Sequence, residues 1–262
     1  MSEAIDGSGT ARARCVLAPN PSPMTLDGTN TWVLAEPDAA RAVVVDPGPA
    51  DEEHLRRVIR EVEASGRRVG RTLLTHGHPD HAAGARRFGE LTGTNVRALD
   101  PAHRLGEEGL TEGDAVELDG LEVRVLETPG HSWDSLCFFV PADGAMLTGD
   151  TVLGRGTTVI ARDGGDLGDY LTSLRRLREV AESAPARALL PGHGPLLDDP
   201  LGVVGYYLAH REERLVQVET ALAAGDRTPE EIVRRVYGDI DENLRPAAMW
   251  SVQAQLDYLA AR

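Results

Sequence analysis

The chain has 262 residues, which suits one large α/β domain with a small appended domain. Its 27 cationic side chains are all Arg and face 42 Asp and Glu, so the net charge is −15. This charge opposes long-range attraction to nucleic acids and anionic membranes, and no run of about 18 apolar residues is present to cross a bilayer.

These features predict a cytoplasmic protein with no membrane partner, because the N-terminal residues are polar and lack the apolar stretch of a signal peptide. The complete absence of Lys is typical of a GC-rich bacterial genome. Two cysteines, Cys15 and Cys137, are too few for a disulfide framework. Each lies in an apolar run, so we expect buried, inert thiols.

The first part of the chain alternates strands with a helix. Three short apolar runs closed by Gly or Pro predict buried strands over residues 31–35, 41–48 and 71–78. Between the last two, residues 51–66 predict an amphipathic helix that Asp51 caps and Gly66 ends. Strand, helix and strand therefore follow one another.

The middle of the chain predicts more strands and one long helix. Strand-like runs cover residues 96–100, 121–130 and 135–150, the last with a hairpin turn at 142–144. Leucines at helical spacing then predict a helix over 166–182, and a buried run follows at 188–194. Together these elements indicate a sheet-rich fold with helices on the outside.

The rest of the chain has an all-helical pattern. Residues 201–225 predict a long amphipathic helix, and residues 244–262 predict a final one. Between them, Thr228 as N-cap and Glu231 three residues later form a capping box. Residues 201–262 carry seven Arg against ten Asp and Glu, a net charge of −3, which favours a packing or lid module over a DNA reader.

Histidine and aspartate are concentrated where strands are expected to end. The segment HGHPDH, residues 76–81, holds three imidazoles and a carboxylate. His131 in ETPGHS, Asp150 in MLTGD and His193 in LLPGHG also lie at the ends of strand-like runs. Imidazole and carboxylate together suit zinc or a similar divalent ion. Without a cation, the clustered groups would compete for protons once buried.

The spacing of these residues favours a site for two metal ions. In an extended segment His76 and His78 point to the same side, and a following turn brings Asp80 and His81 back toward them. Adding the three separated residues makes seven ligands, which are too many for one tetrahedral zinc and suit two ions that share a carboxylate. The other three histidines are expected to have no catalytic role: His54, His103 and His210.

These motifs resemble those of the metallo-β-lactamase superfamily, whose signature is HxHxDH followed by separated His, Asp and His. The resemblance covers the first 200 residues and implies an α+β fold, the αββα sandwich, with two zinc ions at the sheet edge. It implies that His76, His78 and His131 hold one ion and that Asp80, His81 and His193 hold the other, with Asp150 bridging.

Three further segments resemble the β-lactamase-like-protein-2 subfamily in particular: NPSPMTLDGTNTWVL, GDTVLGRGTTV and YYLAHREER. That resemblance implies a catalytic domain over residues 1–200 and a helical, winged-helix-like domain over residues 201–262. The true β-lactamases of the superfamily have Cys at the position of Asp150, so antibiotic hydrolysis is not the expected task. The ligand set is similar instead to the glyoxalase II, lactonase and RNase Z branches, which ligands alone do not separate.

The expected mechanism follows from the metal chemistry. Two zinc ions lower the pKa of a shared water, so that a bridging hydroxide is the nucleophile, and Mn or Fe can occupy the same ligands. Asp80 is the expected catalytic residue, because it can orient the hydroxide and collect a proton. Asp46 is a candidate acceptor for a ligand histidine, and a simple turn residue is the alternative.

The substrate is less well defined by the sequence. Hydrolysis of an ester or thioester suits the acidic chain, with a small-molecule or acyl-linked substrate. Single-strand RNA cleavage is the alternative that the resemblance implies, because the resembled subfamily includes single-strand endoribonucleases. Arg155 and three helix arginines are able to line a phosphate groove: Arg175, Arg176 and Arg178. A solvated helix face is favoured for those helix arginines, and the acidic charge disfavours RNA as a partner.

A non-catalytic metal scaffold is a third possibility, which the complete ligand set disfavours. The glycine-rich loop over residues 154–166 follows Asp150 and is the expected substrate-selecting segment. Within it, Arg155, Thr157 and Thr158 are the candidate substrate-binding residues, with an ordinary turn as the alternative for the two threonines. The sequence makes no prediction of oligomeric state.

Overall fold

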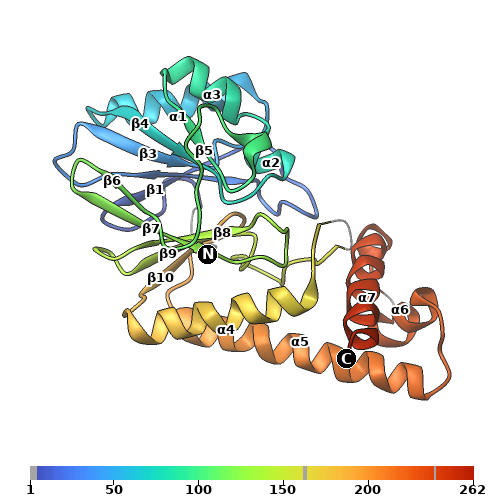
Figure 1. Cartoon of the computed structure of the whole chain (residues 1–262). Coiled ribbons are helices and arrows are strands. Elements are labelled where there is room, and N and C mark those ends of the chain that lie inside the picture. Colours follow the sequence, from blue (N-terminus) through green and yellow to red (C-terminus); the bar gives the residue numbers. More distant parts are fainter. Residues whose placement is uncertain (1–4, 162–163, 239) are drawn as a thin grey trace.

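Two β-sheets lie face to face and helices cover both outer faces, as Figure 1 shows for the computed structural model. The structure describes residues 5–161, 164–238 and 240–262. Two residues of the expected substrate-selecting loop, 162 and 163, lie outside this description. The four layers confirm the αββα sandwich.

The first sheet has five strands in chain order: β1 (Ala13–Leu17), β2 (Asn30–Leu34), β3 (Arg41–Val45), β4 (Arg68–Leu73) and β5 (Val96–Arg97). The first three pair antiparallel and the last three pair parallel. Parallel pairing of β3 and β4 requires a crossover, which α1 (Glu52–Ala64) provides. As predicted, Asp51 caps α1, accepting a hydrogen bond from the amide of His54.

The second sheet has the strand order β10 (Ala188–Pro191), β9 (Ala145–Gly149), β8 (Leu136–Val140), β7 (Leu121–Glu127) and β6 (Ala115–Leu118). The β8–β9 hairpin turns at the predicted position. Only the pair β9–β10 is parallel, and α4 (Leu167–Ser183) connects its two strands.

Three apolar clusters hold these layers together. Between the sheets, Trp32 and Leu34 pack with Phe138 and other fully buried side chains of the second sheet. Val44 and its neighbours pack against α1 and α3 (Ala85–Thr92), and Phe139 packs with α4. Burial of apolar area of this kind is the main stabilising term of a domain. Both cysteines lie inside these layers, and burial raises the pKa of Cys15 to about 12 and that of Cys137 to about 11, which agrees with inert thiols.

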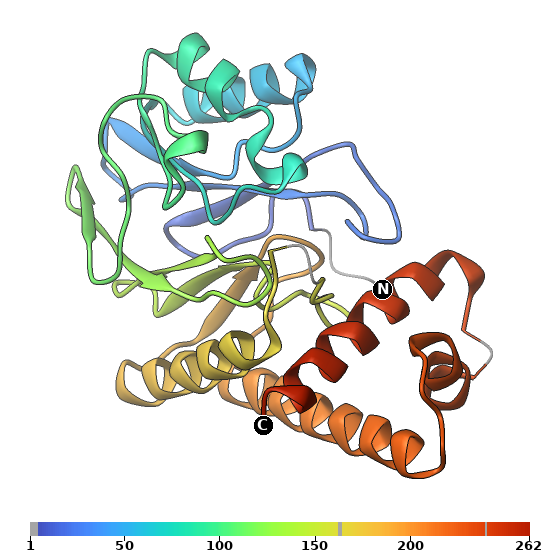
Figure 2. The same ribbon diagram turned by 45° about the vertical axis from the view of Figure 1, so that its right-hand side comes forward.

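The C-terminal part is helical, as predicted. It comprises α5 (Pro200–Ala223), α6 (Pro229–Tyr237) and α7 (Arg245–Ala260), with a 3₁₀ turn η2 (Glu242–Leu244) before the last helix. The capping box of Thr228 and Glu231 is present at the start of α6. Figure 2 shows α7 crossing over α5 near the chain end. Within the described residues, no helix is both long and apolar enough to span a bilayer.

Helix α5 belongs to two cores. Its first half contributes Val204 and Tyr207 to the cluster under α4, and its second half contributes Val218 and Ala221 to a cluster with α6 and α7. The division into residues 1–200 and 201–262 therefore stays a prediction, since one continuous helix connects the two cores.

Candidate metal centre

The seven expected ligands come from segments that follow strands, and they meet at one edge of the sandwich. The residues after β4 supply His76 and His78, and the short helix α2 (Pro79–Ala82) supplies Asp80 and His81. The other three follow β7, β9 and β10: His131, Asp150 and His193. Strands β4, β7, β9 and β10 bring their carboxyl ends to this edge, because β7 and β9 both run antiparallel to β8 and β10 runs parallel to β9.

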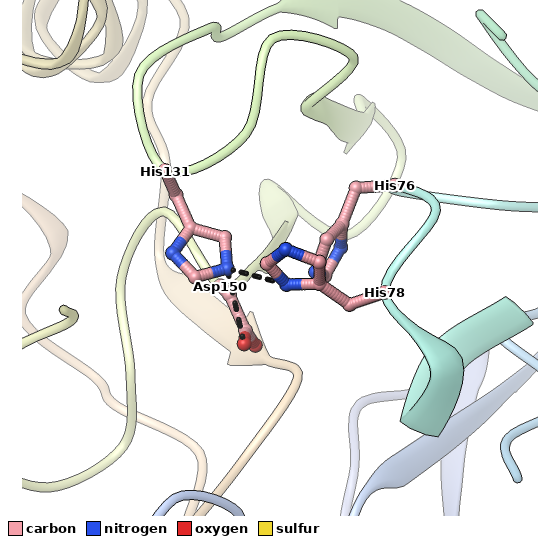
Figure 3. A group of neighbouring side chains, drawn as sticks. All are labelled: His76, His78, His131 and Asp150. Carbon is pink, nitrogen blue, oxygen red and sulfur yellow. Dashed lines mark hydrogen bonds and ion pairs between the residues drawn. The ribbon is translucent and has the colours of Figure 1, made fainter. Parts of the chain in front are cut away.

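A first group contains three imidazoles and a carboxylate (Figure 3). His76, His78, His131 and Asp150 each offer one ligand atom, and these atoms lie within 4.8 Å of one another. The Nε2 atom of His131 lies 3.0 Å from Nδ1 of His78 and 3.6 Å from Oδ2 of Asp150. This donor set is suited to one divalent ion.

A second group contains Asp80, His81 and His193. The Nε2 atoms of the two histidines lie 3.2 Å apart, and Oδ2 of Asp80 lies 3.3 Å from one and 3.2 Å from the other. Oδ1 of Asp150 lies 3.4 Å from His81 Nε2 and 3.3 Å from His193 Nε2. Asp150 therefore stands between the groups with one oxygen turned toward each.

Hydrogen bonds fix which ring nitrogen faces the centre. His131 Nδ1 donates to the carbonyl of Val159 and His193 Nδ1 donates to the carbonyl of Gly28, both at 3.0 Å. A carbonyl only accepts, so the proton must lie on Nδ1 and the Nε2 lone pair must point inward. The Thr75 hydroxyl donates its proton to Asp46 and therefore accepts from His76 Nδ1, which leaves the Nε2 lone pair of His76 facing inward as well.

Asp46 holds the second histidine group from behind. Its Oδ2 accepts a hydrogen bond from His81 Nδ1 at 2.9 Å and from the Thr75 hydroxyl at 2.7 Å, and its Oδ1 accepts from the Thr75 amide at 2.8 Å. Asp46 is 1% exposed and has a φ of 51°, a backbone conformation that non-glycine residues seldom adopt. The side chain thus orients His81, as a carboxylate behind a metal-binding histidine does.

The polar atoms at the centre fit a cation. The buried atoms His76 Nε2 and Asp150 Oδ1 have no hydrogen-bond partner among the described residues, although buried polar atoms ordinarily have one. A Cβ on Gly192 would lie 2.6 Å from Asp150 Oδ1 and 2.7 Å from His81 Cε1, so only glycine allows this close approach. Several acceptor lone pairs are therefore aimed at shared space, which a divalent ion satisfies.

The charges of the centre shift the pKa values in opposite directions. Burial lowers the pKa of His76 and of His131. Burial is the largest single effect on His81 and His193 and disfavours their charge, but the nearby carboxylates together outweigh it. Asp150, Asp80 and Asp46 raise the pKa of His81, and Asp150 and Asp80 bring that of His193 to about 9. Burial would raise the pKa of Asp150, and the positive charges of His193 and His81 lower it instead.

The candidate substrate-binding residues lie on the loop after Asp150. Arg155 is exposed and forms an ion pair with Asp27 of the loop before β2. The hydroxyl of Thr157 lies 3.4 Å from His210 Nε2. Thr158 is 3% exposed, and its hydroxyl donates to the backbone carbonyl of Asp150 at 2.6 Å.

The remaining histidines lie outside the two groups. His54 is 2% exposed, and its Nε2 contacts the hydroxyl of Thr31, which donates to the carbonyl of Asp46. His210 stacks on Tyr206 of the same helix. His103 lies in the 3₁₀ turn η1 (Pro101–His103).

Two residues at the centre are missed by sequence reasoning. Thr29 is fully buried and donates from its hydroxyl to Asp80 Oδ2 at 3.1 Å. Tyr207 of α5 accepts a hydrogen bond from the Leu153 amide at 2.9 Å, which ties the loop after Asp150 to the helix. For Thr29 a signal is present, since a polar GTNT run opens an otherwise apolar strand. For Tyr207 the sequence contains no such signal, because a tyrosine on the apolar face of an amphipathic helix is ordinarily interpreted as a core residue.

Two family models match this chain. A model described as "Metallo-beta-lactamase superfamily" matches residues 24–193, and one described as "Beta-lactamase associated winged helix domain" matches residues 228–262. A protein of Drosophila melanogaster named "Beta-lactamase-like protein 2 homolog" is 31% identical over 266 residues, which cover 93% of this chain and 86% of that protein.

Two further relatives bear on activity and on fold. The protein of Aspergillus fumigatus named "Atrochrysone carboxyl ACP thioesterase" is 32% identical over 243 residues, 85% of this chain and 72% of that protein. The crystal structure of a beta-lactamase domain protein from Burkholderia ambifaria superposes with a TM-score of 0.79 at 24% identity, covering 100% of this chain and 88% of that one. The second likeness shows the shared fold.

Proposed function

The chain belongs to the metallo-beta-lactamase superfamily, whose model matches residues 24–193. From this membership and from the geometry of the centre, we propose that the protein hydrolyses acyl thioesters and uses two metal ions. The observation that carries this proposal is the position of Asp150, which turns Oδ2 toward one imidazole group and Oδ1 toward the other. A carboxylate so placed is suited to bridge two cations.

The residues assigned to each ion follow from the two groups. His76, His78 and His131 would hold one ion, Asp80, His81 and His193 would hold the other, and Asp150 would bridge them. Imidazoles with carboxylates suit Zn²⁺, and Mn²⁺ or Fe²⁺ accept the same donors. When bound, two such ions supply a water of lowered pKa and positive charge beside the carbonyl under attack.

Asp80 is the residue assigned to proton transfer. Its side chain is 27% exposed, whereas that of Asp150 is 11% exposed. Asp80 therefore faces the side from which a substrate arrives. The Thr29 hydroxyl holds Oδ2, and His81 and His193 oppose the effect of burial, so that the net shift of the Asp80 pKa is downward. The carboxylate is thus ionised, and it can orient the attacking water and take up its proton.

The substrate class is supported by the relatives and by the arginines. Two relatives carry the name of acyl-carrier-protein thioesterases, which points to a small or carrier-linked acyl thioester here. For RNA cleavage, free cations along a groove are needed. Arg155 pairs with Asp27, Arg176 with Glu112 and Arg178 with Glu182, an arrangement that does not favour a phosphate groove.

Within the loop after Asp150 we assign different tasks to the three candidate residues. Arg155 is exposed and Thr157 is partly exposed, so both are proposed to contact the substrate. Thr158 is buried against the carbonyl of Asp150, and we propose that it positions this residue rather than touching the substrate.

Asp150→Ala tests the proposal. Metal-reconstituted wild type should hydrolyse an acyl thioester in a panel that also holds lactones, phosphodiesters and a fluorescent RNA. The variant should lose bound metal and thioester turnover together, with kcat/KM down by at least about 10³-fold. Asp169→Ala, at an exposed carboxylate on α4, is the matched control and should keep both.

Two results would count against this function. Full turnover by Asp150→Ala with its metal still bound would remove the bridging role. Salt-sensitive cleavage of the RNA by wild type, with no thioester turnover, would replace the thioesterase with the nuclease alternative.

A further inference from the structure

A third group of ligand-type side chains lies beside the turn that carries His76 and His78. Asp100, His103 and Asp134 each offer one ligand atom, and these atoms lie within 4.8 Å of one another. They come from two segments, because Asp100 caps η1 and His103 ends it, whereas Asp134 lies between His131 and β8. None of the three belongs to the two groups described above.

Gly77 is the point on which two of these side chains converge. A Cβ on Gly77 would lie 2.2 Å from His103 Nε2 and 3.1 Å from Asp134 Oδ2. The imidazole and the carboxylate therefore occupy the space that any other residue at position 77 would fill. Gly77 separates His76 from His78, so the third group packs against the residue that joins two proposed metal ligands.

The burial of Asp134 without a partner indicates that this group binds a ligand. It is 5% exposed, and none of the described residues donates a hydrogen bond to its carboxylate or forms an ion pair with it. Burial of the residue removes much of the water around this carboxylate, and no hydrogen bond or ion pair from the described residues replaces it, which is costly. Its nearest ligand-type neighbours are an imidazole and a second carboxylate, so one more anion would be repelled and a cation attracted.

The distances suit an ion better than a direct contact. His103 Nε2 lies 3.9 Å from Asp100 Oδ2, which is too long for a hydrogen bond. Ligands with bonds of about 2.1 Å to one ion lie up to about 4.2 Å from each other. Small rotations of the three side chains are therefore enough to close the group around a cation.

We propose that Asp100, His103 and Asp134 bind a further divalent transition-metal ion, separate from the two ions of the proposed function. One imidazole and two carboxylates suit Zn²⁺ or Mn²⁺, with water completing the coordination. The ion cross-links η1 and the segment before β8 across the Gly77 turn. It thereby holds the backbone between His76 and His78 in place and has no part in the reaction itself.

Metal stoichiometry tests this site with Zn²⁺ as the probe. Metal-free full-length protein is saturated with Zn²⁺, desalted and analysed for zinc per chain. Wild type should retain three equivalents, and His103→Gln and Asp134→Asn should each retain two. His210→Gln changes a half-buried histidine outside all three groups and should retain three, as the matched control.

A double variant that lacks ligands of both proposed catalytic ions distinguishes zinc bound at the third site from zinc bound at the catalytic pair. His78→Ala with His193→Ala should retain one equivalent, and adding His103→Gln should remove it, together with the rise in melting temperature that Zn²⁺ produces. If His103→Gln and Asp134→Asn, folded by circular dichroism, bind as much zinc as wild type, the third site is wrong. If wild type binds one equivalent that only His103→Gln removes, the third site stands and the catalytic pair fails.

Discussion

Asp46 combines an unusual backbone conformation with three hydrogen bonds to the residues that hold the centre. A non-glycine residue at a φ of 51° costs free energy, and such strain persists where the surrounding structure fixes it. The hydrogen bonds to Thr75 and His81 supply that constraint. Of the two interpretations that the sequence left open, we therefore favour an orienting role over a simple turn.

Asp46→Asn should weaken metal binding without unfolding the protein. The amide keeps the shape of the side chain but offers a neutral acceptor to His81, so zinc affinity should fall about 10- to 100-fold. Competition with a chelator measures the affinity. The matched control is Asp119→Asn, another aspartate at positive φ, which pairs with Arg41 far from the centre and should leave affinity unchanged. Equal affinity in the Asp46 variant would refute the orienting role.

His54 predicts a pH dependence of stability. Burial, and after it the charge of Arg57, lower its pKa in the folded protein to about 4, against 6.5 without these effects. Below pH 6.5 the unfolded chain takes up a proton that the folded protein accepts only near pH 4. The free energy of unfolding therefore falls through this window, by up to about 3 kcal/mol from this residue.

Denaturant titrations of metal-free wild type and His54→Gln between pH 7 and pH 4 measure this contribution. The variant should start less stable at pH 7, because it loses the contact with Thr31, and should lose less stability on acidification. Parallel decreases in the two proteins would show that His54 is not the titrating group.

Among single residues, the sequence predicts which side chains come together at the centre. Ligand residues are recognisable because His76, His78, Asp80 and His81 are clustered by spacing alone. Their orientation is not, because the atoms that fix each ring come from distant segments, such as the Gly28 carbonyl that accepts from His193. Asp134 is invisible in the sequence for a similar reason, since its significance depends on burial beside Gly77.

Strand ends position the ligands, and this is where predicted and observed elements differ most. A strand over residues 71–78 is predicted, whereas β4 ends at Leu73. The Thr75 amide donates to the Asp46 side chain and the Leu136 amide donates to the Thr75 carbonyl, so the backbone leaves the sheet ladder before the histidines. The end of this strand depends on a side-chain acceptor from another segment, and a local sequence pattern does not predict such an acceptor.

Helix α5 reaches the loop after Asp150 through Tyr207. The tyrosine is 2% exposed, accepts from the Leu153 amide and donates to the Gly156 carbonyl at 3.1 Å. The same loop carries Arg155 and Thr157. A residue of the C-terminal helices therefore sets the conformation of the proposed substrate-binding segment.

Tyr207→Phe should loosen that segment and leave the metal ligands intact. Loss of the hydroxyl leaves the Leu153 amide without its partner, at a cost of about 1–3 kcal/mol. The KM for a thioester should rise several-fold, while zinc content stays at the wild-type value. Tyr206→Phe alters the exposed neighbour and is the control. A wild-type KM in the Tyr207 variant would separate α5 from substrate binding.

The whole molecule combines an acidic surface with a buried concentration of imidazole and carboxylate. Most strands and the helices α1 and α4 were predicted as elements, from short apolar runs and capped amphipathic segments, whereas β6 and α3 were not. The pairing of β9 with β10 across α4, which brings Asp150 beside His193, was not, because it joins segments separated by some forty residues. That pairing, together with β3 and β4 in the other sheet, assembles the centre.

The C-terminal helices complete the molecule rather than standing apart from it. Helix α7 packs on both α4 and α5, and the family model for a winged helix domain covers residues 228–262. Among the described residues no strand follows β10, so the predicted winged-helix-like region is represented here by helices alone. Its negative charge and its packing on α4 fit the packing module that the sequence favoured over a DNA reader.

If seven side chains hold two metal ions, anomalous X-ray diffraction at the zinc edge will locate both ions. Crystals of the zinc-reconstituted chain should show one peak enclosed by His76, His78 and His131 and a second enclosed by Asp80, His81 and His193, with Asp150 between them. Well-ordered crystals of folded, zinc-saturated protein with no anomalous peak at either position would show that these side chains do not bind the two ions.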